Sequence, residues 1–276
     1  MPDKSILITG CSSGIGLCVA AGLKDRGHRV FATARQQPDV EKLQADGFES
    51  LQLDLADSDS IRASVAEILS RTGGSLDALF NNGAYGQPGA VEDLTREVLR
   101  SQFETNLFGW HELTNLVIPV MRRQGHGRII QHSSVLGFVA LRYRGAYNAS
   151  KYALEGLSDT LRLELANTQI DVSLIETGPV TSRFRHNAYK AYKANIDPTN
   201  SVHREKYLAM EKRLQTEGPV VPFTLPPQAV LKKVIHALES KRPKARYYVT
   251  FPTYLFATLK RLLSTRALDR LLNKVG

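Results

Sequence analysis

The stretch that decides the fold is Thr9-Gly10-Cys11-Ser12-Ser13-Gly14-Ile15-Gly16, which follows the apolar run Ser5–Thr9. A strand, a glycine-rich loop and then a helix form the phosphate-binding turn of nucleotide-binding folds. We expect Gly10 to allow a tight turn, Gly14 to let the backbone approach a pyrophosphate, and Gly16 to let the helix pack closely. The glycine spacing differs from G-x-G-x-x-G, so the prediction rests on the strand–loop–helix context.

Outward from this loop, short apolar runs alternate with helical patterns. Strands are predicted at Ser5–Thr9, Arg29–Thr33, Ser50–Leu53, Asp77–Asn81, Gly127–Ser133, Asp171–Glu176 and Tyr247–Phe251. Helices are predicted at Gly16–Arg26, Ile61–Thr72 and Tyr147–Leu165, the last with Leu154, Leu157, Leu161 and Leu165 on one face. Such alternation predicts an α/β fold, a doubly wound parallel sheet of about seven strands with ligands bound at its carboxyl edge.

The whole chain, 1–276, is predicted to be a single Rossmann-type domain with its core in 4–180 and 228–251. The segment 181–227 breaks the alternation and contains five prolines and scattered aromatic residues. A long insertion at the ligand edge predicts a helical lid over a substrate site, and the alternative is a plain surface insertion.

The charge of this chain is uneven. It has 276 residues, 36 Lys and Arg, 27 Asp and Glu, and a net charge of +9. Residues 241–276 contain nine basic residues and one acid, so the rest of the chain is nearly neutral. That distribution, with no nucleic-acid-binding motif, excludes nucleic acid as the expected partner. The two cysteines, Cys11 and Cys18, exclude a disulfide framework, and the histidine spacings predict no metal site.

The basic tail, 252–276, predicts a C-terminal extension of two short amphipathic helices with a break at Ser264-Thr265. One apolar face comprises Leu255, Phe256, Leu259, Leu262 and Leu263, and the other comprises Ala267, Leu268, Leu271, Leu272 and Val275. The tail either packs on the domain or a subunit partner, or docks on an anionic membrane. With no signal peptide recognisable, a cytoplasmic protein is expected, with peripheral contact at the inner face of a membrane as the alternative.

The second strand ends in Ala34-Arg35. NAD-binding sites usually carry an acidic residue here to hold the ribose 2′-hydroxyl. An arginine with no carboxylate beside it can instead pair with a 2′-phosphate, so Arg35 predicts NADP(H). The alternative is a solvated arginine at a strand end.

Two further motifs carry proton chemistry. Tyr147 and Lys151 are four residues apart on a predicted helix and share a face. A nearby cation favours the phenolate and would lower the tyrosine pKa, which suits a general acid–base. Ser134 ends a strand at the ligand edge, 13 residues before Tyr147, so both can reach one carbonyl group.

Together these residues resemble the short-chain dehydrogenase/reductase family over nearly the whole chain. The resemblance includes the loop Thr9–Gly16, Asp54 after the third strand and the segment Asn81-Asn82-Gly83-Ala84. Asn106, Ser134, Tyr147 and Lys151 match the catalytic tetrad of the family in order and approximate spacing. The chain is also similar to a narrower group, the bacterial NADPH-dependent aldehyde reductases with retinol- and steroid-dehydrogenase-like relatives.

The resemblance implies a role for each residue. Tyr147 would protonate the carbonyl oxygen, Lys151 would lower the tyrosine pKa and hold the nicotinamide ribose, and Ser134 would orient the carbonyl. Asn106 would hold a water that links Lys151 to solvent. The implied cofactor-binding residues are Gly10, Ser12, Ser13, Gly14, Ile15, Gly16, Arg35, Asp54, Leu55, Asn82, Gly83, Tyr147, Lys151, Gly178, Val180 and Ser182.

This chain departs from the family pattern twice. It has Asn81-Asn82-Gly83-Ala84 where N-N-A-G is usual, and Thr177-Gly178-Pro179 where the family has P-G. The second change puts the rigidity of the nicotinamide-side loop in doubt.

The predicted substrate pocket contains Phe138, Tyr143 and Phe184 and suits an apolar substrate, although these side chains could also simply pack under the lid. The predicted function is NADP(H)-dependent interconversion of carbonyls and alcohols by a homodimer or homotetramer. The alternative is a non-catalytic dinucleotide-binding sensor or scaffold, associated with membranes through its tail.

Overall fold

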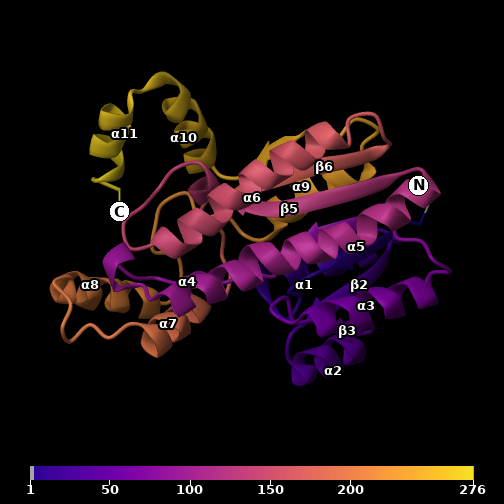
Figure 1. Cartoon of the computed structure of the whole chain (residues 1–276), viewed down its shortest axis with the longest axis horizontal. Helices are drawn as coiled ribbons and strands as arrows, with labels where there is room; N and C mark the ends of the chain where they lie inside the picture. The colour runs from indigo at the N-terminus through magenta and orange to yellow at the C-terminus, as the bar shows by residue number, and fades with distance from the viewer. Residues whose placement is uncertain (1–2, 276) are drawn as a thin grey trace.

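The computed structural model describes residues 3–275 and contains one sheet of seven parallel strands. They are β1 (Ser5–Ile8), β2 (Arg29–Ala34), β3 (Glu49–Gln52), β4 (Ala78–Asn81), β5 (Gly127–Ser134), β6 (Ile170–Thr177) and β7 (Arg246–Tyr248). Their order is β3-β2-β1-β4-β5-β6-β7 (Figure 1). The predicted doubly wound parallel sheet is confirmed.

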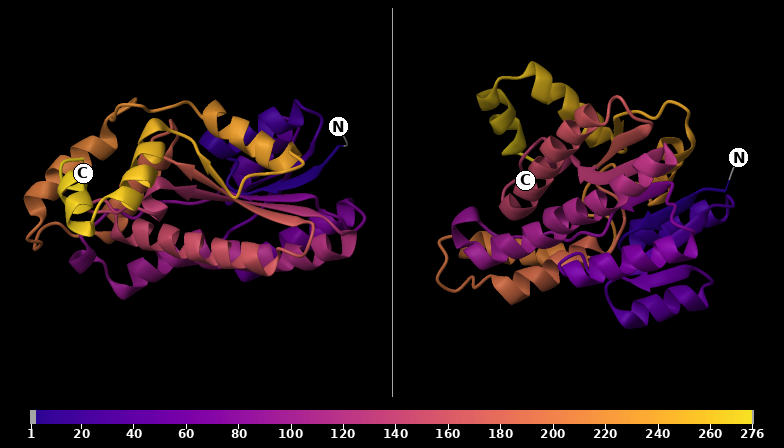
Figure 2. Two further views of the ribbon diagram at one scale, coloured as in Figure 1. Left: turned by 90° about the horizontal axis from the view of Figure 1, so that it is seen from above. Right: turned by 45° about the vertical axis from the view of Figure 1, so that its right-hand side comes forward.

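Helices cover both faces of the sheet (Figure 2). They are α1 (Gly14–Lys24), α2 (Gln37–Ala45), α3 (Ser58–Arg71), α4 (Arg96–Phe103), α5 (Gly109–Gln124), α6 (Gly145–Glu164), α7 (Phe184–Asn195), α8 (Arg204–Gln215), α9 (Gln228–Glu239), α10 (Phe251–Leu262) and α11 (Thr265–Leu272). Three short turns are η1 (Val91–Asp93), the π-helical η2 (Glu104–Phe108) and η3 (Val135–Gly137). Helices α1, α2 and α9 pack on one face, and α3, α5 and α6 pack on the other.

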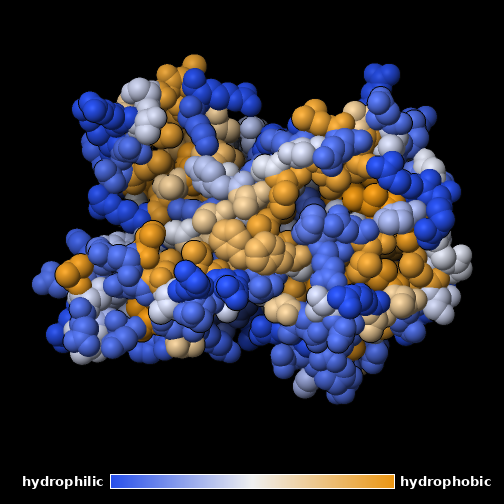
Figure 3. Space-filling model, viewed as in Figure 1, coloured by the Kyte–Doolittle hydropathy of each residue, from blue (hydrophilic) through white to orange (hydrophobic). Residues whose placement is uncertain are grey.

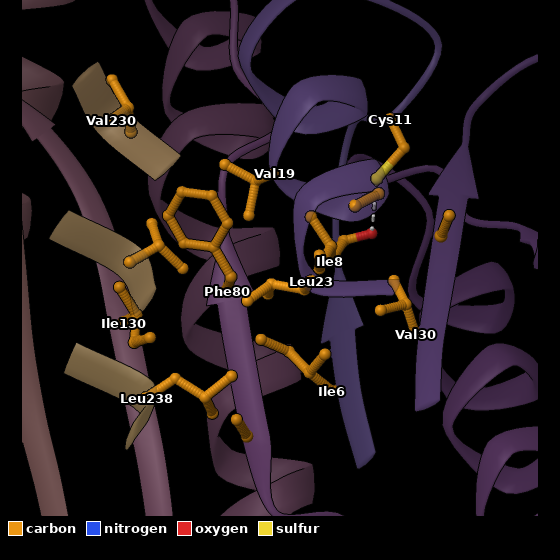
Figure 4. Close-up of a cluster of buried hydrophobic side chains, with 14 of the residues drawn as sticks. Ile6, Ile8, Cys11, Val19, Leu23, Val30, Phe80, Ile130, Val230 and Leu238 are labelled. Carbon is orange, nitrogen blue, oxygen red and sulfur yellow. Dashed lines mark hydrogen bonds between the residues drawn. The ribbon is translucent and has the colours of Figure 1, made fainter. Parts of the chain in front are cut away.

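The alternation of side chains along the strands builds these two layers. Ile6 and Ile8 point into the layer of α1 and α9, while Leu7 between them points into the layer of α3 and α5. Figure 4 shows the first layer, in which Cys11 is fully buried and its thiol donates to the Ile8 carbonyl oxygen at 3.4 Å. Burial raises the pKa of this thiol to about 12, so Cys11 is a small packing residue.

The strand order reverses at β1, because β2 pairs with one side of β1 and β4 pairs with the other. Ligands of open α/β sheets bind at the carboxyl end of the strands at such a point. The glycine-rich loop follows β1 directly, so it lies at this position.

Segment 181–227 forms α7 and α8, and the tail forms α10 and α11; in Figure 1 both pairs lie on the left, at the carboxyl end of the strands. No helix within 3–275 is long and apolar enough to cross a bilayer.

One predicted strand boundary is wrong, and two predicted apolar faces are only partly covered. The last strand ends at Tyr248 rather than Phe251, because Pro252 suits the first turn of a helix and α10 starts at Phe251. On the predicted apolar face of α6, Leu154 is buried but Leu157 is 46% exposed. On the predicted apolar face of the first tail helix, Phe256 is buried but Leu255 and Leu262 are exposed.

Candidate active site

The glycine-rich loop is shaped by close backbone contacts. Gly10 has a φ of +71°, which favours glycine, and a side chain there would meet the Cα atom of Gly83. A Cβ atom on Gly16 would lie 2.2 Å from the Gly10 carbonyl oxygen. The tight turn expected at Gly10 and the close packing expected at Gly16 are therefore present.

The first turn of α1 offers unpaired N–H groups. Its N-cap residue, Ser13, makes no side-chain capping bond, and Ser12 beside it is exposed. The amides of Gly14, Ile15 and Gly16 have no acceptor among residues 3–275. Free amides and the positive end of a helix dipole fit a phosphate group.

The residues expected around an adenosine lie beside this loop. Arg35 is exposed just beyond β2, and its side chain makes no ion pair with any residue of 3–275. Asp54 is half-buried and accepts a hydrogen bond from the Ala56 amide at 3.0 Å. Leu55 is buried, and its methyl group would contact a Cβ atom added at Gly83.

A hydrogen-bonded chain that the sequence did not reveal links the ends of β4, β5 and β6. Asn82 donates to the carbonyl oxygens of Thr9 and Gly10, at 2.8 and 3.2 Å. Its side-chain oxygen lies 2.9 Å from Nδ1 of His132, whose Nε2 lies 3.3 Å from the Thr177 hydroxyl. His132 therefore connects Asn82, which contacts the glycine-rich loop, with Thr177 at the end of β6.

His132 remains neutral. Its burial, and then the charge of Lys151, lower its pKa to about 3. The oxygen of Asn82 needs a donor, which places the proton on Nδ1. Only its position at a strand end beside Ser133-Ser134 signalled this role in the sequence.

The structure brings Ser134, Tyr147 and Lys151 together. Ser134 ends β5 and is nearly buried, while Tyr147 and Lys151 lie on the first turns of α6. The Lys151 ammonium donates to the His132 carbonyl oxygen at 2.7 Å and lies 4.1 Å from the ring centre of Trp110. Lys151 is 1% exposed and forms no ion pair with the described residues.

Burial dominates the electrostatics of this cluster. It lowers the pKa of Lys151 to about 7, an effect that Glu155 opposes. It raises the pKa of Tyr147 to about 12, and the Ser134 hydroxyl acts in the opposite direction. Burial is the larger effect on the tyrosine pKa in this arrangement, where the Lys151 ammonium bonds a carbonyl oxygen and lies 5.7 Å from the phenol ring centre, so the expected lowering of that pKa by Lys151 stays a prediction.

Asn106 lies in the π-helical turn η2, where α4 passes into α5. Its amide donates to the Tyr85 carbonyl oxygen at 2.8 Å, and its oxygen accepts from the Tyr85 amide at 3.2 Å. Such π turns occur often at functional sites. In this structure Asn106 fixes the chain after β4; its expected water relay stays a prediction.

The nicotinamide-side residues follow β6. A Cβ atom on Gly178 would lie 2.1 Å from the Thr250 hydroxyl, so only glycine fits there. Val180 pairs with Leu225 across the two ends of the lid segment. Ser182 lies against the glycine-rich loop, because a Cβ atom added to Gly14 would be 3.2 Å from the Cβ atom of Ser182.

The three predicted pocket residues occupy different places. The Phe184 ring packs edge-on against Tyr147, with ring centres 5.2 Å apart. Phe138 packs with Tyr147 in the cluster under the tail, formed around Leu136, Val139, Phe256 and Leu272. Tyr143 packs under the lid, where its hydroxyl lies 3.2 Å from His203. Phe138 and Phe184 therefore contact the Tyr147 region, and Tyr143 supports the lid.

Comparison with known proteins finds relatives that match nearly the whole chain. The family model described as short chain dehydrogenase matches residues 4–193. The chain is 42% identical over 270 residues to the uncharacterised oxidoreductase YbbO of Escherichia coli K12, covering 98% of this chain and 94% of that protein. It is 33% identical to human retinol dehydrogenase 8, covering 96% and 87%. A solved short-chain dehydrogenase from Streptomyces avermitilis superposes with a TM-score of 0.77 at 29% identity, covering 99% of this chain and 97% of that one.

Proposed function

Because this chain belongs to the short-chain dehydrogenase/reductase family of oxidoreductases, we propose that it interconverts an apolar aldehyde or ketone and the alcohol with NADP(H). The observation that carries the proposal is Lys151, a buried cation beside Tyr147 without a carboxylate partner in the described chain. Burying an unpaired cation costs stability, and such groups cluster at functional sites.

The chain offers fitting groups for the dinucleotide. The free amides of Gly14, Ile15 and Gly16 would hold the pyrophosphate, and the unpaired guanidinium of Arg35 would hold a 2′-phosphate. Gly178, Val180 and Ser182 would border the nicotinamide. When bound, the nicotinamide supplies or accepts the hydride.

The protein side of the reaction is proton transfer. The buried Tyr147 phenol keeps its proton at neutral pH and would donate it to the carbonyl oxygen as the hydride arrives. The Ser134 hydroxyl would donate to the same oxygen and orient it. Lys151 is held by the His132 carbonyl and would stabilise the phenolate left on Tyr147.

An apolar substrate is supported by the rings near the phenol. Phe184 packs on Tyr147, and Phe138 belongs to the same apolar cluster as Tyr147. The name of the human relative, a retinol dehydrogenase, also points to an apolar alcohol.

The test is an NADPH-oxidation screen over alkyl, aryl, retinoid and steroid carbonyls, with Tyr147→Phe as the matched variant. We expect wild type to reduce an apolar carbonyl, and the variant to lose about 10³-fold in kcat while binding NADPH normally. NADPH binding without turnover on any carbonyl would instead support the dinucleotide sensor. Substantial turnover by Tyr147→Phe would exclude Tyr147 as the proton donor.

A further inference from the structure

Helix α10 is apolar on two sides. Its inner residues Phe256 and Leu259 pack in the cluster that includes Phe138 and Tyr147. Four other apolar residues lie on its outer side and are 40–75% exposed: Phe251, Tyr254, Leu255 and Leu262. A surface helix needs only one apolar stripe, so the outer one is unexplained by the fold except at Tyr254, whose ring packs edge-on against Tyr248 with ring centres 5.3 Å apart.

The lid extends this outer stripe. Phe223 is 57% exposed, and its ring centre lies 4.9 Å from that of Phe251. Its φ of +60° is unfavourable for a phenylalanine. We call Phe223 and the four outer residues of α10 the outer ridge. Contiguous exposed apolar side chains with a charged rim are typical of interaction sites.

The charge beside the ridge is positive. Residues 252–276 contain Lys260, Arg261, Arg266, Arg270 and Lys274 against the single acid Asp269. All five basic side chains are exposed, but the Lys260 ammonium donates to the Phe138 carbonyl oxygen and lies over the Tyr152 ring, which leaves Arg261, Arg266, Arg270 and Lys274 beside the ridge. Figure 3 shows hydrophilic and hydrophobic side chains gathered together over α10 and α11.

The other basic residues of the C-terminal segment do not add to this rim. Arg246 pairs with Glu155, Glu176 and Asp159. Residues 241–244 precede β7, and the ridge follows it.

We propose that α10 and α11 dock on an anionic lipid surface, with the outer ridge in the apolar boundary and the basic side chains among the headgroups. Apolar burial and attraction to anionic lipid both favour this contact. A second copy of the chain is a poorer occupant, because a two-fold contact through the ridge would bring two positive segments together.

Docking would also decide where the substrate comes from. The inner side of α10 packs against the Phe138 and Tyr147 cluster, so the outer side would bring the substrate side of the site to the bilayer. Resting on the proposed function, this predicts an apolar carbonyl that partitions into lipid as the substrate class.

The experiment is sedimentation of the full chain with vesicles of phosphatidylcholine, with and without one-third phosphatidylglycerol. We expect binding to the anionic vesicles alone, and release at high salt. Leu255→Ser/Leu262→Ser and Arg266→Glu/Arg270→Glu should each lower the partition coefficient at least about tenfold.

Matched changes elsewhere control for these variants. Leu163→Ser changes a leucine of α6 that is 72% exposed, close to the 75% of Leu262. Arg122→Glu/Arg123→Glu makes the same charge change on exposed residues of α5. Both controls should bind vesicles as wild type does.

Several results would overturn the proposal. These are no binding to anionic vesicles, an equal loss in the control variants, or a ridge variant that changes only the oligomeric mass in light scattering. The last result would assign the ridge to a contact between copies.

Activity separates docking from chemistry. With a short water-soluble aldehyde, Leu255→Ser/Leu262→Ser should reduce the substrate as fast as wild type. With a long-chain aldehyde held in anionic vesicles, its rate should fall by the same factor as its vesicle partition coefficient. Equal rates on the vesicle substrate would refute delivery from lipid. Failure of wild type on every carbonyl, with vesicle binding intact, would refute the proposed function and leave docking standing.

Discussion

The two sides of the site are built differently. The cofactor side, meaning the glycine-rich loop and the ends of β1, β4 and β5, is fixed by backbone contacts that leave no room for a Cβ atom on Gly10 or Gly16. The substrate side, meaning α7, α8, α10 and α11, is held by two clusters of four buried residues each. The first can change little without moving the backbone, whereas the second can be reshaped by side-chain replacement. Substrate choice should therefore be easier to alter than cofactor binding.

The sharpest test of this contrast is Gly16→Ala. The added methyl group would meet the Gly10 carbonyl oxygen, and overpacking of backbone costs about 1–3 kcal/mol, so NADPH binding should weaken up to about 100-fold. Gly156→Ala is the control, because nothing lies within 4 Å of a Cβ atom there. Fluorescence titration with NADPH measures the effect, and an affinity within threefold of wild type would contradict the rigid-loop account.

The second test concerns the phosphate contact. Arg35→Asp should weaken NADPH about 30-fold and NADH less than threefold, because it replaces a charge-assisted bond by repulsion. Arg62→Asp, on an exposed position of α3, should change neither affinity by more than about twofold. An unchanged preference for NADPH over NADH would show that Arg35 does not bind the 2′-phosphate.

A change on the substrate side should act on the carbonyl alone. Phe184→Ala removes the ring that packs on Tyr147 and should raise the KM for an apolar carbonyl about tenfold, with NADPH affinity unchanged. Leu208→Ala, at an exposed position on α8, is the control. A larger change in NADPH affinity than in the KM for the carbonyl would contradict the distinction between the two sides.

The smallest expected effect is a pH dependence on the cofactor side. The Lys151 pKa of about 7 lies below its ordinary value, so its positive charge is present below pH 7 and is lost above it. If that charge holds the cofactor ribose, kcat/KM for NADPH should fall roughly fivefold between about pH 7 and 8. Lys151→Arg, which stays charged, should flatten the profile. A flat profile in wild type would show that the charge is not needed.

Local pattern carried most of the fold. The apolar runs located all seven strands within a few residues, and the glycine loop stood where the sequence placed it. The tail shows the limit: its two helices, their break and an apolar face with Leu255 and Leu262 were predicted, but only the structure shows that these two leucines are exposed. Periodicity gives the residues that share a face, but not which face finds a partner.

The basic C-terminal segment also reads differently in the sequence and in the structure. Arg246 counts as part of the basic segment in the sequence, yet it lies among Glu155, Asp159 and Glu176, from α6 and β6. Those carboxylates are 70 or more residues away along the chain, so no local pattern could pair them with it.

The sequence by itself determined the strand–loop–helix start, the alternation that builds the parallel sheet, and the residue types of the candidate site. These depend on neighbours within a few positions, where steric rules and hydrophobic period act directly. Only the tertiary structure decided that burial sets the ionisation of Tyr147 and Lys151, and that His132 joins Asn82 to Thr177. Desolvation and long-range hydrogen bonds depend on which distant segments meet, and that is settled only when the sheet assembles.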